Sequence, residues 1–290
     1  MQRGLRIILV LVVFIMFIGL TVSWFVASEL VKPRNLEVGT PPISLPISLG
    51  LVPVSFDSES GGKIFGWHGR AKESRGVILL LHGIRSNRTA MVERARFLTE
   101  QSFSVLLIDL QAHGESLGKE ITVGYREKYD VRAAVSFAKS QHPGEGIGII
   151  GVSLGGAAAV LGAPLAVDGM IIESIYPDIR SAVANRVEKR LGAMAPLATW
   201  LLLWQLEFRL NISPGDLRPI DKIAAVGCPI LIISGSLDSH TTEEETRAIY
   251  AAAHKPKSMW IVPGAGHVDL HRFLADDYAR RVVEFFSETL

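Results

Sequence analysis

A serine enclosed by glycines is the feature of this sequence best suited to chemistry. Ser153 is the central residue of the pentapeptide Gly-Val-Ser-Leu-Gly at 151–155, which follows the apolar run 147–150 and precedes the small-residue stretch 157–161. This order predicts a buried strand, a sharp turn with the serine at its apex, and a helix packed closely against the strand. Because such a turn leaves little room for β-carbons on either side, glycine at both ends of the pentapeptide fits it.

An aspartate and a histidine farther along the chain are placed to activate Ser153. A serine hydroxyl is a weak nucleophile near neutral pH, so it needs a base to accept its proton and an acid to orient that base. The apolar run 229–233 is followed by Asp238, which we expect at the carboxyl end of a strand. The run 258–262 is followed by a glycine-rich loop that ends in His267. The sequence therefore predicts Asp238 as the acid and His267 as the base.

Four other polar residues near these motifs are given structural roles. Asp109 also follows an apolar run, but it precedes the serine in the chain and its position suits a turn or a helix cap. His82 is expected to stabilise its own loop through backbone groups, since the base is assigned elsewhere. His240 and Asp269, which are close to the acid and the base in the sequence, are expected to be polar loop residues.

Two patterns imitate metal or cofactor sites. His267 and His271 have the i, i+4 spacing of metal ligands on a helix, but the glutamate of the zinc-protease motif is missing between them. The stretch 146–151 matches the dinucleotide fingerprint G-x-G-x-x-G, with Glu173 about twenty residues later. Its first two glycines, however, lie before or within the predicted strand, whereas a dinucleotide site needs them in the turn after it. We therefore expect neither a metal nor a cofactor.

The chain order serine, aspartate, histidine is that of the α/β hydrolases. From about Val54 to the C-terminus the sequence resembles the α/β-hydrolase superfamily of serine hydrolases, particularly its membrane-anchored, esterase- and lipase-like branch. Besides the serine pentapeptide, the resemblance rests on Leu-His-Gly at 81–83, Asp-x-x-x-His-Gly-x-Ser at 109–116 and Gly-x-Gly-His at 264–267. It implies the α/β-hydrolase fold, in which helices cover both faces of a mostly parallel central sheet and a helical cap is inserted.

The resemblance also implies where the reaction's negative charge is stabilised. The family places one arm of the oxyanion hole directly after the histidine and glycine at 82 and 83, so the backbone amide of Ile84 is one expected donor. The amide of Leu154 is the other, because it follows the nucleophile at the start of a helix. Backbone amides need no particular side chain, so these two donors rest on the resemblance alone.

Short apolar runs alternate with helical stretches along the first half of the domain. Strands are predicted at 64–68, 76–81 and 105–108, and helices at 89–100 and 125–140. Alternation of this kind predicts a mostly parallel sheet with helices on both faces and with the active residues at the carboxyl ends of the strands.

The N-terminus contains a long apolar segment. Residues 5–27 are apolar apart from one arginine, Arg6, and two hydroxyl residues, a length that matches a helix crossing a bilayer. A secretory signal peptide has a shorter apolar core of roughly 7–15 residues, so an uncleaved single-pass anchor is favoured, although 26–28 offers a cleavage site. Arg3 and Arg6 precede the span, which favours a cytoplasmic N-terminus and an extracytoplasmic catalytic domain.

These signals divide the chain into three parts. We expect a transmembrane anchor with its flank at 1–30, a proline-rich extended linker at 31–53, and a hydrolase domain at 54–290. The domain is expected to contain a cap insertion at about 174–222, between the strand predicted at 169–172 and the strand that leads to Asp238. The oligomeric state is left open by the sequence.

The cap insertion contains an apolar stretch, 196–208, with almost no polar face. A helix of this kind must be buried or must meet lipid, and it is too short to cross a bilayer. By itself it fits an ordinary core helix, but the N-terminal anchor favours a lid. We therefore predict that four residues contact an acyl chain or the membrane: Trp200, Leu203, Trp204 and Phe208.

Composition agrees with one catalytic domain. A chain of 290 residues, 48% of them hydrophobic, can bury one large core, and a net charge of +1 lacks the basic surface of a nucleic-acid-binding protein. We expect a membrane-anchored serine hydrolase that cleaves carboxylic ester or thioester bonds of lipid-like acyl substrates. A serine peptidase or amidase on the same fold stays open as an alternative, as does a non-catalytic membrane-tethered binding module.

Overall fold

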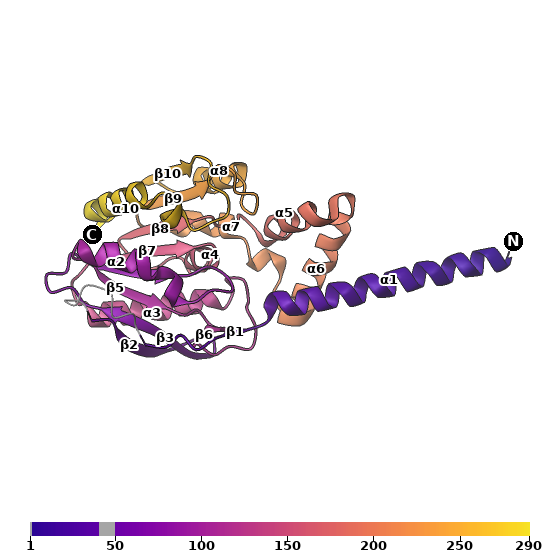
Figure 1. Ribbon diagram of the computed structural model, residues 1–290, viewed down its shortest axis with the longest axis horizontal. Coiled ribbons are helices and arrows are strands. Elements are labelled where there is room, and N and C mark those ends of the chain that lie inside the picture. Colours follow the sequence, from indigo (N-terminus) through magenta and orange to yellow (C-terminus); the bar gives the residue numbers. More distant parts are fainter. Residues whose placement is uncertain (1, 41–49) are drawn as a thin grey trace.

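The centre of the molecule is an eight-stranded sheet whose strand order is β10-β9-β8-β7-β4-β5-β3-β2 (Figure 1). The computed structural model describes residues 2–40 and 50–290. Neighbouring strands are parallel except for the pairs β2–β3 and β3–β5, which are antiparallel. The strands are β2 Val52–Ser58, β3 Gly62–Gly69, β4 Val77–Leu81, β5 Ser104–Ile108, β7 Ile147–Val152, β8 Gly169–Glu173, β9 Ile230–Gly235 and β10 Lys257–Val262.

Helices cover both faces of this sheet, as the sequence predicts. The central strands β4, β5 and β8 are buried along their whole length, which is the environment that runs of valine, isoleucine and leucine favour in a parallel sheet. Helices α3, α4 and α8 pack on one face, and α2 and α10 pack on the other. These helices are α2 Val92–Glu100, α3 Glu127–Gln141, α4 Leu154–Leu161, α8 Glu243–Ala252 and α10 Ala275–Thr289.

β2 and α10 are among the elements that were not predicted from the sequence. β2 begins at Val52, inside the segment expected to be a linker, and its exposed and half-buried residues alternate at the edge of the sheet. α10 received no assignment, although its spacing of Tyr278, Val282 and Phe286 buries one face of the helix. Both elements lie at the margins of the predicted alternation of strands and helices, so neither changes the position of the active residues.

The N-terminal helix α1, Gln2–Val31, projects from the domain and ends against it (Figure 1). Its segment Leu5–Val31 is 27 residues long and apolar enough to cross a membrane, a property that a signal sequence near the N-terminus shares. The chain is hydrogen-bonded to the domain from the last residue of this helix onward. The amide of Ile121 donates to the carbonyl of Val31 at 2.7 Å, and the short strand β1, Arg34–Asn35, pairs in parallel with β6, His113–Gly114. The beginning of the expected linker is therefore part of the domain surface, and its residues 41–49 lie outside the described residues.

The insertion between β8 and β9 forms the helical cap. It contains α5 Ile179–Leu191, α6 Ala195–Leu210 and α7 Pro219–Lys222. Asp178 caps the start of α5 by accepting from the amide of Ser181 at 3.0 Å. In Figure 1, α5 and α6 lie on the side of the sheet from which α1 projects, and α6 crosses the end of α1.

The turn between β7 and α4 brings helix and sheet unusually close together. A β-carbon at Gly151 would lie 2.6 Å from the Cα of Gly156, and one at Gly155 would lie 2.6 Å from the Cβ and 2.7 Å from the carbonyl oxygen of Leu81. Backbone atoms of neighbouring elements cannot move aside easily, so these positions require glycine. The pentapeptide at 151–155 is thus explained by a close approach of α4 to β7 and β4.

Gly155→Ala is expected to destabilise the domain by about 1–3 kcal/mol, because its methyl group must displace the backbone of β4. Gly227→Ala is the matched control, since a β-carbon there meets no atom within 4 Å. Thermal unfolding of the two detergent-solubilised proteins measures the difference. Equal melting temperatures would contradict the close approach of α4 to the sheet.

Candidate active site

Ser153 occupies the sharp turn that its neighbours predict. It lies between the last residue of β7 and the first residue of α4, and its backbone has φ 49° and ψ −107°. A positive φ is unfavourable for a residue with a side chain, and it is maintained here because the turn is fixed on both sides. The amide of Ser153 donates to the carbonyl of Glu173 on β8 at 2.8 Å, and Gly83 lies next to the serine side chain.

Asp238 and His267 form a hydrogen-bonded pair. The Nδ1 of His267 lies 2.8 Å from Oδ2 of Asp238, while Oδ1 accepts from the amides of His240 at 2.8 Å and Thr241 at 2.9 Å. Burial opposes ionisation of this carboxyl, but the histidine and the two amides outweigh it, so the pKa of Asp238 lies below its usual value. An ionised Asp238 keeps the proton of His267 on Nδ1 and leaves Nε2 as an acceptor.

The fold brings the three predicted catalytic residues to one edge of the sheet. Ser153, Asp238 and His267 follow the carboxyl ends of β7, β9 and β10, which are joined through β8. The loops that bear the acid and the base are bonded to each other, since the amide of Leu237 donates to the carbonyl of Ala265 at 2.8 Å. In the described part of the chain the hydroxyl of Ser153 makes no hydrogen bond. Catalytic hydrogen bonds often tighten only when the substrate binds.

Two backbone amides near Ser153 are free to donate. Within the described ranges, neither Ile84 nor Leu154 uses its amide in a hydrogen bond. Leu154 is the first residue of α4, where amides have no partner inside the helix and the helix dipole favours negative charge. Ile84 follows Gly83, whose added β-carbon would lie 3.7 Å from the Cβ of Ser153. The two expected oxyanion donors are thus unbonded amides, one directly after Ser153 and one directly after Gly83, and their role stays a prediction.

Two buried histidines hold the loop that contains Ile84. His82 accepts from the amide of Leu110 at Nε2, at 3.1 Å, and its Nδ1 donates to the carbonyl of Gly83 at 2.7 Å. The Nε2 of His113 accepts from the amide of Arg85 at 3.0 Å. Burial, together with the neighbouring ring 5.1 Å away, lowers the pKa of His82 to about 3. His82 therefore has the structural role expected of it.

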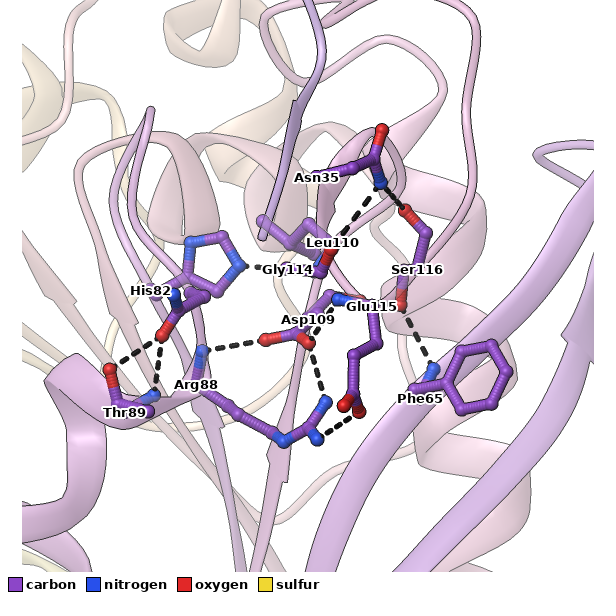
Figure 2. Close-up of polar contacts among 11 residues, drawn as sticks. Asn35, Phe65, His82, Arg88, Thr89, Asp109, Leu110, Gly114, Glu115 and Ser116 are labelled. Atoms are coloured by element: carbon purple, nitrogen blue, oxygen red, sulfur yellow. Dashed lines mark hydrogen bonds and ion pairs between the residues drawn. The ribbon is translucent and has the colours of Figure 1, made fainter. Parts of the chain in front are cut away.

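Asp109 also has the structural role expected of it (Figure 2). Its carboxylate is fully buried and accepts from the amide of Arg88 at 2.7 Å, from Nη1 of Arg88 at 2.5 Å and from the amide of Glu115 at 2.9 Å. Gly114 adopts a positive φ beside it, and a β-carbon there would lie 2.2 Å from the carboxylate. Asp109 closes its own loop and has no hydrogen bond to the histidine of the catalytic pair.

A buried arginine, Arg94, forms ion pairs that the sequence did not reveal and that hold the loop of His267 in place. Arg94 on α2 lies 2.9 Å from the carboxylate of Glu173 at the end of β8 and 2.9 Å from that of Asp269. Tyr278 on α10 donates to the same Glu173 carboxylate. Arg94 thus links the strand that supports Ser153 to the loop that contains the base. Arg94 and Glu173 are 79 residues apart, and no local pattern marks them as partners.

The cap helix α6 divides the four predicted lid residues into two groups. Leu203 is only 5% exposed and packs in a core cluster with α5, so it is not placed to contact a membrane, and its contact with an acyl chain stays a prediction. The reason is that it faces the inner side of the helix, opposite its neighbours. Trp200, Trp204 and Phe208 are 57%, 49% and 69% exposed on the outer side.

Comparisons with known proteins show which families of sequence this chain is similar to. Residues 72–212 match the family model described as serine aminopeptidase, S33. The chain is 26% identical over 239 residues to the uncharacterized protein YqkD of Bacillus subtilis, covering 79% of this chain and 77% of that protein. It is 28% identical over 220 residues to the uncharacterized protein Rv2307c of Mycobacterium tuberculosis, covering 74% and 72%.

Solved structures share the fold over most of the chain. The esterase Pf2001 of Pyrococcus furiosus superposes with a TM-score of 0.72 at 25% identity, covering 90% of this chain and 98% of that one. The α/β hydrolase GrgF of a Penicillium species superposes with a TM-score of 0.66 at 17% identity, covering 83% and 99%. At such identities the superpositions establish the fold, and the catalytic roles depend on the residues described above.

The neutral state of His82 predicts how stability depends on pH. Its pKa is about 3 in the folded protein, against about 6.5 in an unfolded chain, so between these values only the unfolded state binds the proton. Stability is therefore retained above about pH 6.5 and falls as the pH is lowered toward 3, by up to about 1.4 kcal/mol per pH unit for this group. Denaturant unfolding at a series of pH values measures the slope.

In the variant His82→Gln, the free energy of unfolding should depend less steeply on pH, by the equivalent of about one proton. The variant is expected to be less stable than the original protein at neutral pH. His254→Gln at an exposed position is the control, and its slope should equal that of the original protein. An unchanged slope in His82→Gln would mean that His82 is protonated in the folded state.

Proposed function

We propose that this chain, which has the α/β-hydrolase fold, is a membrane-anchored serine hydrolase that cleaves carboxylic esters or thioesters with apolar acyl groups. The observation that carries the proposal is the strained turn at Ser153 beside the hydrogen-bonded pair of Asp238 and His267. The sharp turn places the Ser153 side chain at the carboxyl end of β7 with no hydrogen bond to another described group, which is the placement that a nucleophile needs.

The reaction follows from these positions. Nε2 of His267 accepts the hydroxyl proton as Oγ of Ser153 attacks the acyl carbon, and the carbonyl oxygen becomes an oxyanion that receives hydrogen bonds from the amides of Ile84 and Leu154. Collapse of this intermediate breaks the bond to the alcohol or thiol, which leaves with the proton from His267. Water then attacks the acyl-enzyme, gives its proton to His267 and releases the acid, while Asp238 keeps the imidazole oriented throughout.

The rigid surroundings of the oxyanion donors support this mechanism. The loop with Ile84 is held by His82 and His113, both buried and both with a pKa below the usual value because of burial. An amide that does not reorganise when charge develops stabilises the transition state more than a mobile one. The amide of Leu154 is equally fixed, since it begins a helix packed tightly on the sheet.

An apolar substrate is favoured by the surroundings of the site. The cap exposes aromatic side chains on α6, and the apolar helix α1 ends beside it. The esterase Pf2001, whose fold this chain shares, supports an ester as the class of substrate. A thioester of the same acyl group places the same atoms at Ser153 and differs only in the leaving sulfur.

Aminopeptidase activity is the second candidate, because the matching family model is described as a serine aminopeptidase. An aminopeptidase must bind a positively charged amino terminus near the serine. The guanidinium of Arg186 on α5 lies on this side of the site, where burial and this charge together lower the pKa of His240. A cation at the rim repels an ammonium group, which favours an ester.

The catalytic assignment predicts the behaviour of three variants. A fluorophosphonate probe should label the native protein and should not label Ser153→Ala. Ser153→Ala and His267→Ala should each abolish most ester turnover while the protein stays folded, and Asp238→Asn should lose about a thousandfold or more, because its imidazole is misoriented. Combining the substitutions should cost little more than the largest single one, since the three residues act as a unit.

Two outcomes would contradict these assignments. No labelling of the folded native protein would favour the non-catalytic binding module. Nearly full activity in Asp238→Asn, together with a folded but inactive Asp109→Asn, would transfer the role of the acid to Asp109.

The substrate class predicts a dependence on acyl length. Each methylene buried in an apolar site contributes about 0.8 kcal/mol, so kcat/KM for a series of nitrophenyl esters should rise by about fourfold per methylene until the site is filled. Aminoacyl nitroanilides should be hydrolysed more slowly than the esters, because an amine is a poorer leaving group. A flat ester series with faster anilide hydrolysis would favour the aminopeptidase.

A further inference from the structure

The outer side of the cap helix α6 is an exposed apolar stripe. Its members follow one another at intervals of three or four residues, which places them along one side of a helix. We call this stripe the α6 face, and it consists of Leu197, Trp200, Trp204 and Phe208, which are 52%, 57%, 49% and 69% exposed. Four large apolar side chains in one row on a surface indicate a contact surface.

The α6 face ends where α6 contacts the N-terminal helix. Gln205 donates to the hydroxyl of Ser23 at 2.5 Å. Arg209 donates to the carbonyl of Trp24 at 2.7 Å and to the hydroxyl of Ser28 at 2.8 Å, and its guanidinium lies 3.5 Å from the centre of the Trp24 ring. Gln205 and Ser23 are buried, so α6 and the end of α1 form one rigid unit.

The length of α1 determines where a bilayer would meet this unit. The apolar segment begins at Leu5, and a helix needs about 20 residues to cross the hydrocarbon core, so the crossing ends near Trp24. Tryptophan is a residue favoured at that boundary. The ring of Trp24 lies 6.5 Å from that of Phe208. The end of the α6 face is therefore at the level of the bilayer surface, and α5 and α6 project on the side from which α1 leaves the domain (Figure 1).

We propose that the α6 face lies in the interfacial layer of the bilayer beside α1, so that the domain contacts the membrane through two elements. This inference rests on the membrane-anchoring part of the proposed function and not on catalysis. Indole rings suit this layer, since they have an apolar body and one polar N–H group. Arg190 is exposed at the end of α5, where it can meet anionic headgroups, whereas Lys189 donates to the hydroxyl of Ser239 in the loop of Asp238.

The second contact has a consequence for the substrate. A single helix leaves the domain free to rotate about the helix axis, whereas a second contact fixes one orientation. In that orientation the cap, whose helix α5 is bonded to the loop of Asp238 through Asn185 and the carbonyl of His240, rests on the lipid. The ester is then one carried by a membrane lipid or inserted in the bilayer, and its acyl chain reaches the serine without crossing water.

Spin labels test the position of the α6 face in the full-length protein. The only cysteine, Cys228, is replaced by alanine, and the protein is reconstituted into vesicles of phosphatidylcholine and phosphatidylglycerol. Single cysteines labelled with a nitroxide are then introduced as Trp200→Cys, Trp204→Cys, Ile18→Cys and Val52→Cys. Val52 is the matched control, because it is 53% exposed and pairs with His68 at the amino edge of the sheet, opposite the site.

Collisions with oxygen, which is concentrated in lipid, and with a water-soluble nickel chelate report the surroundings of each label. Labels at 200 and 204 should collide more with oxygen than with the chelate, as should the label at 18, and the label at 52 should show the reverse. The same pattern is expected in Ser153→Ala, so a failure of the catalytic assignment leaves this result unchanged.

Three results would overturn the inference. Free access of the chelate to 200 and 204, with 18 protected, would place the α6 face in water. Protection of the labels at 200 and 204 from both reagents, with spectral lines that broaden as the amount of protein per vesicle rises, would mean that a second copy of the chain covers the α6 face. Access of the chelate to 18 would show that α1 is not in the bilayer, and the membrane-anchoring proposal would fail with it.

A charged substitution gives an independent measurement. Trp204→Glu should lower the hydrolysis of an ester presented in vesicles by about tenfold more than that of a short soluble ester, because the carboxylate must leave the interface. Val52→Glu should change neither rate. Equal losses on both substrates in Trp204→Glu would assign Trp204 to the packing of the cap.

Discussion

The close approach of α4 to the sheet is the constraint on which the rest of the site depends. Because Gly155 and Gly156 allow the helix to lie against β4 and β7, the chain must turn sharply at Ser153 and accept a positive φ there. The same turn places the first free amide of α4 next to the serine side chain. The conformation of Ser153 and the position of the Leu154 amide thus have a single steric cause.

The other catalytic groups depend on polar contacts that are sheltered from water. His82 and His113 remain neutral because they are buried, and only a neutral ring can accept the amide hydrogen bonds that hold the loop of Ile84. Arg94 is charged and buried, and it is compensated by Glu173 and Asp269. Removing one member of such a group leaves an unpaired charge, so these contacts maintain the geometry of the site.

The N-terminal helix is bonded to the catalytic domain, in contrast to a helix connected only by a flexible linker. Its last turns contact the cap through Gln205 and Arg209, and the two-residue strand β1 pairs with β6 soon after the helix ends. Asn35 in β1 donates to the carbonyl of Ser116 at 2.9 Å (Figure 2). The segment 113–116 also contains His113, which accepts from the amide of Arg85 in the loop of Ile84. The chain that follows α1 and the loop of Ile84 are therefore both bonded to this segment.

The sequence by itself determined the local features: the strand, turn and helix around Ser153, the order of Asp238 and His267, and the apolar N-terminal span. These are visible because each depends on residues within one or two elements, where periodicity and glycine position are direct consequences of backbone geometry. Only the tertiary structure decided that Leu203 faces the core and that Arg94 joins Glu173, because these contacts depend on which elements the fold brings together. The same reason explains why the expected linker at 31–53 contains a strand, β1, that pairs with β6. A short extended segment pairs only where a distant partner is available, and no local pattern encodes that partner.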